Sequence, residues 1–143
     1  MYTYLSKSRE DTVKFAAEFA KKLPKDCVIA FLGDMGAGKT AFVSGLAKGL
    51  GIECDVSSPT FSICNHYIGA DHSLYHFDMY RIDGWDDLYS TGFFDCLDSG
   101  GYVAVEWAEN VFTALPEDSV IVDISKISEN EREFKICKKG EVI

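Results

Sequence analysis

The stretch that decides the fold is residues 27–50, which read CVIAFLGDMGAGKTAFVSGLAKGL. Its first six residues form a continuous apolar run that is too short for a helix and ends at Gly33, a pattern typical of a strand buried on both faces. From Lys39 onward the apolar residues recur at helical spacing, and Gly51 is placed to end that helix. The order of strand, glycine-rich loop and helix predicts an α/β protein.

The loop itself matches the pattern G-x-x-x-x-G-K-[ST], which a chain of this length meets by accident roughly one time in a hundred. Glycines let successive backbone N–H groups face phosphate oxygens at the positive end of a helix. In this pattern Lys39 reaches the terminal phosphates and Thr40 offers its hydroxyl to Mg²⁺. A bare turn is the alternative, but the loop predicts a bound magnesium nucleoside triphosphate. Its residues are Gly33, Asp34, Met35, Gly36, Ala37, Gly38, Lys39 and Thr40.

The segments around the loop predict the rest of the architecture. Ser8 and Asp11 form a plausible capping box before a helix that ends ahead of Pro24. Residues 61–68 and 74–82 are rich in aromatic and β-branched residues and predict a hairpin, followed by short helix and loop over 84–98. Further strands are expected at 102–105, 120–127 and 133–137. The prediction is a single domain over 1–143, with a P-loop NTPase-like three-layer fold and a mixed central sheet flanked by helices.

Composition limits the partners and the compartment. The net charge is −9, from 23 acidic and 14 basic residues, so the chain repels polyanions and any role on RNA should run through a partner protein. Five cysteines without a Cys-x-x-Cys pair fit reduced, mostly buried thiols in a cytoplasmic protein. We expect no signal peptide and no membrane contact, because no apolar stretch approaches the length of a membrane span.

Hydrolysis at such a loop needs an acid near the metal, usually at the end of a buried strand. Glu106 follows the apolar run 102–105 and is the expected acid of the Mg²⁺ shell, with an ordinary surface carboxylate as the alternative. Strand alternation places His76, Asp78 and Tyr80 on one face, and Asp78 is the expected residue that orients the attacking water. The alternative for that face is a solvated side of the hairpin.

Two neighbouring features are ambiguous from the sequence. Residues 57–60 lie between the loop helix and the hairpin, where nucleotide-sensing switch segments often occur, but a Ser-Pro pair also simply makes turns. Trp107 follows Glu106 and either packs beside the nucleotide or, as is more common for tryptophan after a buried strand, belongs to the core.

Four motifs together resemble the TsaE (YjeE) family, in order and in spacing, over most of residues 8–110. They are the loop motif at 33–40, Ser58-Pro59-Thr60-Phe61, His76-Phe77-Asp78-Met79-Tyr80-Arg81 and Val105-Glu106-Trp107. The resemblance implies an ATPase that works with the TsaB and TsaD proteins in adding the threonylcarbamoyl group to the adenosine beside the anticodon of certain tRNAs. It implies ATP and Mg²⁺ as cofactors, and tRNA contact only through the complex.

The resemblance also assigns roles to particular residues. It implies that Thr40 and Glu106 attend Mg²⁺ and that Thr12 and Arg132 approach the nucleotide. It makes switch-like segments of Ser58, Pro59, Thr60 and Phe61 and of His76, Tyr80 and Arg81. Ala41 also belongs to the expected nucleotide site, although the family commonly has a second threonine there, and this should tune binding without abolishing it.

Three other functions compete with this prediction. A P-loop small-molecule kinase would use the same loop, but such enzymes usually need several arginines, and of Arg9, Arg81 and Arg132 just Arg81 lies within a site motif. A GTPase is disfavoured because no Asn-Lys-x-Asp segment is present. A nucleotide-gated binding module with little turnover remains open.

Overall fold

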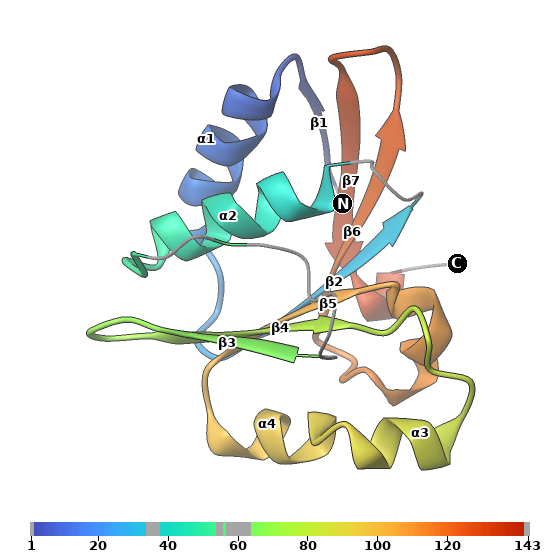
Figure 1. The fold of residues 1–143 in the computed structure, drawn as a ribbon. Helices are drawn as coiled ribbons and strands as arrows, with labels where there is room; N and C mark the ends of the chain where they lie inside the picture. The colour runs from blue at the N-terminus through green and yellow to red at the C-terminus, as the bar shows by residue number, and fades with distance from the viewer. Residues whose placement is uncertain (1, 34–37, 54–55, 57–63, 142–143) are drawn as a thin grey trace.

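A computed structural model describes residues 2–33, 38–53, 56 and 64–141 (Figure 1). Within this part, the chain forms a seven-stranded sheet in the order β1-β7-β6-β2-β5-β4-β3. The central strands β6, β2, β5 and β4 run parallel, whereas β1, β7 and β3 pair antiparallel at the two edges. The mixed sheet expected from the sequence is therefore confirmed. The strands are β1 (Tyr2–Ser6), β2 (Val28–Gly33), β3 (Cys64–Ile68), β4 (Ser73–Asp78), β5 (Tyr102–Glu106), β6 (Val120–Lys126) and β7 (Arg132–Lys138).

Helices cover both faces of the sheet and complete three layers (Figure 1). Helices α1 and α2 lie on one face, and α3 and α4 lie on the other. The two helices after the hairpin occupy the segment for which short helix and loop were expected. The helices are α1 (Arg9–Ala20), α2 (Lys39–Gly49), α3 (Trp85–Ser90) and α4 (Phe93–Ser99), with the 3₁₀ segments η1 (Ala108–Ala114) and η2 (Lys139–Glu141).

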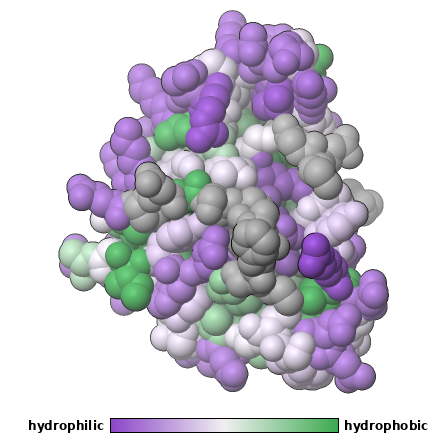
Figure 2. Space-filling model, in the orientation of Figure 1, coloured by the Kyte–Doolittle hydropathy of each residue, from purple (hydrophilic) through white to green (hydrophobic). Residues whose placement is uncertain are grey.

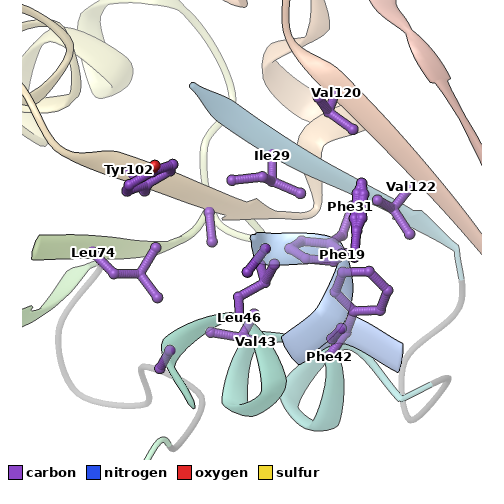
Figure 3. Packing of buried hydrophobic residues seen from close by; sticks show 14 of the residues in the cluster. Phe19, Ile29, Phe31, Phe42, Val43, Leu46, Leu74, Tyr102, Val120 and Val122 are labelled. Carbon is purple, nitrogen blue, oxygen red and sulfur yellow. The ribbon is translucent and has the colours of Figure 1, made fainter. Parts of the chain in front are cut away.

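Strand β2 divides the hydrophobic core in two. Ile29 and Phe31 point into the cluster formed with α1 and α2, part of which Figure 3 shows. Val28 and Ala30 point into the opposite cluster, which includes residues of α3, α4 and η1. Because successive side chains of a strand face opposite ways, a strand between two helical layers must be apolar throughout. This confirms the strand expected from residues 27–32.

Helix α1 begins as the sequence predicts, with one difference. The Ser8 hydroxyl accepts a hydrogen bond from the Asp11 backbone N–H at 3.0 Å. The Asp11 carboxylate accepts from the Lys7 N–H at 3.0 Å, one residue earlier than a reciprocal capping box would require. The same carboxylate accepts from the Tyr4 hydroxyl, which lowers the pKa of Asp11. The start of α1 is thus fastened to β1.

Close packing of α1 on α2 depends on two glycines. A Cβ atom at Gly45 would lie 2.4 Å from the Val13 carbonyl oxygen, and one at Gly49 would lie 2.3 Å from that of Ala17. Neither distance is possible for a real side chain, so the glycines let the backbones of the two helices come into close contact. Helix α2 ends at Gly49 with Leu50 as its C-cap, and Gly51 follows in a left-handed conformation (φ 76°).

Some expectations were wrong. Strand β1 was not foreseen, because an edge strand with mostly exposed residues carries no apolar run. The described cysteines are less buried than expected: Cys27 is buried, whereas Cys64, Cys96 and Cys137 are half-buried, and Cys54 lies outside the described residues. Burial raises the pKa of the Cys27 thiol to about 12.

Candidate functional site

The glycine-rich segment begins and ends at residues whose backbone requires glycine. Gly33 ends β2 with φ 122°, and a Cβ atom there would lie 2.3 Å from the carbonyl oxygen of Ile124 on the neighbouring strand β6. Gly38 precedes α2 with φ 100°, again a conformation that disfavours side chains. The expected phosphate contacts of Asp34, Met35, Gly36 and Ala37 lie outside the described residues.

Lys39 is the first residue of α2, and its ammonium group is buried. The residue is only 4% exposed, and its Nζ makes no hydrogen bond to any described residue. Its nearest identified partner is the ring of Trp107, whose centroid lies 4.3 Å from Nζ. A cation over an aromatic face is partly compensated, but three N–H donors remain to be satisfied. This arrangement leaves a positive charge available to an anion at the start of a helix.

Thr40 and Ala41 continue the first turn of α2. Thr40 is half-buried, and Ala41 is buried. The expected Mg²⁺ ligand therefore follows directly on the expected phosphate ligand, at the same end of the helix.

The ends of β4 and β5 bring the two expected acids together. These strands are parallel, and Asp78 stands directly opposite Glu106 in the register. Glu106 is buried, and its Oε2 lies 2.5 Å from Nε2 of His76, which is fully buried. An ionised carboxylate can only accept, so the imidazole N–H donates in this pair. The surface-carboxylate alternative for Glu106 is wrong.

The expected alternation of His76, Asp78 and Tyr80 stops before the third residue. Strand β4 ends at Asp78, whose carboxylate accepts a hydrogen bond from the Tyr80 N–H at 2.9 Å and turns the chain. Tyr80 consequently lies beyond the strand and is exposed, as is Arg81. His76 contacts Glu106 inside the protein, so a solvated hairpin face is wrong for this residue.

Trp107 connects the lysine to the segment after β4. It has φ 57°, which is uncommon for a residue other than glycine. It is half-buried and packs against the core cluster that includes Val105 and Ala108, so the expected core position is partly confirmed. Its ring centroid lies 4.9 Å from that of Tyr80 and 4.3 Å from Nζ of Lys39. The contact with Lys39 was missed by sequence reasoning, although the position of Trp107 directly after Glu106 was an available signal.

Backbone contacts fasten the two loops that follow β4 and β5. The Met79 N–H donates to the Glu106 carbonyl at 3.0 Å. The side-chain amide of Asn110 donates to the carbonyls of Met79 and Tyr80, at 2.9 and 3.3 Å. The residues around Asp78 are therefore held against the strand that carries Glu106.

A small cavity of about 220 Å³ adjoins the start of α2. Thr12 and Arg132 line it together with Gly38 and Ala41. The approach of Thr12 and Arg132 to a nucleotide stays a prediction. The Arg132 guanidinium donates to the carbonyls of Ser128, Glu129 and Glu131, while its Nε has no partner among the described residues. Thr12 is buried and shares a hydrogen bond of 2.6 Å with the Ser6 hydroxyl. The cavity walls are Ser8, Arg9, Thr12, Gly38, Ala41, Glu129, Asn130 and Arg132.

Ser58, Pro59, Thr60 and Phe61 lie outside the described residues. In the ranges that the structure covers, no cluster of three or more His, Cys, Asp or Glu side chains could hold a metal ion. No helix within those ranges is long and apolar enough to cross a membrane.

Fold and site define the class: an α/β protein in which glycines join a central parallel strand to a helix that opens with a buried lysine. A family model described as "Threonylcarbamoyl adenosine biosynthesis protein TsaE" matches residues 6–134. The chain therefore belongs to the TsaE family, a family of tRNA threonylcarbamoyladenosine biosynthesis.

Individual relatives agree with this assignment. TsaE proteins of Treponema pallidum and Aquifex aeolicus are 35% and 39% identical to the chain, over 93% and 92% of its length and 98% and 92% of theirs. The TsaE protein of Bacillus subtilis is 39% identical over 89% of this chain and 77% of its own. The crystal structure of Bacillus subtilis YdiB superimposes with a TM-score of 0.76, at 32% identity, covering 97% of this chain and 86% of that one.

Proposed function

We propose that the chain is a magnesium-dependent ATP-binding and ATP-hydrolysing accessory protein for threonylcarbamoyl modification of the tRNA adenosine beside the anticodon, acting with TsaB and TsaD. The observation that carries the proposal is the buried ammonium group of Lys39, which lacks a hydrogen-bond partner among the described residues. It stands at the first turn of α2, directly after the glycine-rich segment. The pathway is inferred from family membership, and ATP binding and hydrolysis are inferred from this site.

The described residues fit a nucleoside triphosphate. The unpartnered Lys39 Nζ matches the terminal phosphates, and the α2 N-terminus adds positive potential. Gly33 keeps the backbone free of side-chain atoms where the strand meets the loop. The cavity beside Gly38, with Thr12 and Arg132 in its walls, offers space for the rest of the nucleotide.

The described residues also fit magnesium. Mg²⁺ at phosphate sites usually takes one or two protein oxygens and fills its other positions with water and phosphate oxygens. Thr40 and Glu106 would hold it, and the bound ion would neutralise charge on the phosphate oxygens. His76 keeps the Glu106 carboxylate in one position, and Asp78, opposite Glu106 in the register, is available to orient the attacking water.

The negative net charge of the chain supports the proposal that it meets tRNA through TsaB and TsaD and does not bind tRNA directly. A net charge of −9 opposes binding to a phosphate backbone. A cytoplasmic location accords with this pathway.

The test is ATP hydrolysis by the purified chain with and without TsaB and TsaD. We expect slow hydrolysis that rises when both partners are present, and a loss of nucleotide binding of about 100-fold or more in Lys39→Ala, since charge-assisted phosphate contacts are strong. Lys48→Ala is the matched control, because Lys48 is exposed near the end of the same helix. Nucleotide binding that is equal in the two variants would contradict the site. Transfer of labelled phosphate to a nucleoside or sugar would favour the kinase alternative.

A further inference from the structure

Helices α3 and α4 expose three aromatic side chains that contact one another: Trp85, Tyr89 and Phe94. Trp85 is 52% exposed and Tyr89 is 65% exposed, while Phe94 is half-buried. The ring centroid of Phe94 lies 6.2 Å from that of Trp85 and 5.1 Å from that of Tyr89. We call this surface the α3 face. Aromatic residues gathered on a surface, and above all Trp and Tyr, are typical of protein–protein contact sites.

The segment of chain that carries the α3 face is acidic, and the exposed Arg81 lies just before it. No lysine or arginine occurs between Arg81 and Lys126, and residues 82–125 contain ten acidic residues. Five of these acids lie on or beside the two helices and are all exposed: Asp83, Asp86, Asp87, Asp95 and Asp98. Figure 2 shows hydrophilic residues interleaved with pale ones toward the end of the molecule where α3 and α4 lie.

This charge selects among possible occupants. Nucleic acid and anionic lipid surfaces are repelled by the acids, and a second copy of the same face would meet its own charge. A protein segment with lysines or arginines around an apolar side chain matches both the aromatic centre and the acidic rim. The complementary occupant is therefore basic and proteinaceous.

The α3 face is firmly seated on the domain, close to the candidate site. Leu88 of α3 and Phe93 of α4 are buried, and the ring of Phe93 lies 5.4 Å from that of Phe77 on β4. Phe77 lies between His76 and Asp78 in the sequence. A partner on the α3 face would thus be separated from the expected catalytic strand by one layer of core side chains.

We propose that the α3 face is the docking surface for a basic segment of the partner proteins with which this chain acts. The proposal rests on the proposed function, because it takes the TsaB–TsaD pair as the source of that segment. Beyond the proposed function, it identifies the surface of this chain that contacts the partner and the basic character of the partner segment.

The experiment measures binding of the full chain to the TsaB–TsaD pair of the same organism, in the presence of ATP and Mg²⁺. We expect Trp85→Ala with Tyr89→Ala to weaken binding by about 30-fold or more, as loss of interface aromatics commonly does. Asp86→Lys with Asp87→Lys should weaken it as well and should reduce its dependence on salt. Tyr2→Ala and Asp71→Lys are matched controls, since both residues are exposed away from α3 and α4.

Two readouts separate this proposal from the proposed function. Nucleotide affinity and hydrolysis by the isolated chain report on the nucleotide site and should be unchanged in all four variants. Binding of the pair that is unaffected by the α3 variants overturns the docking surface while the ATPase assignment stands. The docking proposal would also be overturned if the wild-type chain bound tRNA or phosphatidylserine vesicles and the Trp85 and Tyr89 substitutions abolished that binding. The same holds if the wild-type chain self-associated and these substitutions abolished the self-association.

Discussion

Replacing His76 by phenylalanine should destabilise the protein, because it leaves the buried Glu106 carboxylate without its partner. The Glu106 side chain is 7% exposed, and the contact with His76 is its only hydrogen bond to a described side chain. Removing one member of a buried pair costs about 3–5 kcal/mol, and the phenyl ring should recover part of this by filling the imidazole space, so we expect a loss of about 3 kcal/mol. For 143 residues that corresponds to a melting temperature lower by about 10 °C.

Thermal and urea unfolding, followed by circular dichroism, would measure this loss. His76→Gln is the matched control, because its amide can still donate to the carboxylate, and it should lose only about 1 kcal/mol. Combining His76→Phe with Glu106→Gln should cost less than the sum of the single losses, since no charge is then left unpaired. A loss below 1 kcal/mol in His76→Phe, or strictly additive losses in the double variant, would refute the reasoning.

Three further predictions concern packing and titration. Gly45→Ala should destabilise the protein by about 1–3 kcal/mol, although alanine has the better helix propensity, because its Cβ would press on the α1 backbone. Gly84→Ala is the control and should change the unfolding free energy far less, since an added Cβ there would meet no atom of the described residues within 4 Å, its chain neighbours aside. Trp107→Leu should reduce the unfolding free energy by about 1 kcal/mol, because the cation–π contact with Lys39 is lost. In a Lys39→Met background that contact is already absent, so the same substitution should cost less when unfolding of the single and double variants is compared. Burial raises the pKa of the Cys27 thiol from 9.0 to about 12, so the thiol ionises at lower pH in the unfolded chain than in the folded one. The free energy of unfolding should therefore be constant in this respect below pH 9 and should decline as the pH rises from 9 toward 12. Urea unfolding at pH 8 and pH 10.5 would check this, with a smaller decline in Cys27→Val.

Local pattern was sufficient for the centre of the fold. The run that became β2 is apolar at every position because both its faces are covered, and a short apolar run between turn signals is specific for that environment. The two limits of the glycine-rich segment could also be predicted, because Gly33 and Gly38 adopt backbone conformations that few other residues tolerate. Strand β1 escaped prediction since its pairing with β7 is set by backbone hydrogen bonds at the sheet edge, which leave little trace in hydrophobicity.

The contacts of the candidate site depend on residues far apart in the sequence. The pairing of His76 with Glu106 follows from the parallel alignment of β4 and β5, which no local pattern reports. Tyr80 was placed wrongly because alternation was extended past Asp78, whose own side chain ends the strand by accepting the Tyr80 N–H. The Lys39–Trp107 contact requires both the register of β5 and the left-handed conformation of Trp107.

The two glycines between α1 and α2 also bear on the entropy of ligand binding. With backbone pressed against backbone at Gly45 and Gly49, the second half of α2 has little room to tilt or slide on α1. Ordering a residue costs about 1–2 kcal/mol of conformational entropy, and this cost is avoided for groups that are held in place beforehand. The fold itself therefore holds this half of α2 in place, so binding at the proposed nucleotide site would not have to order it.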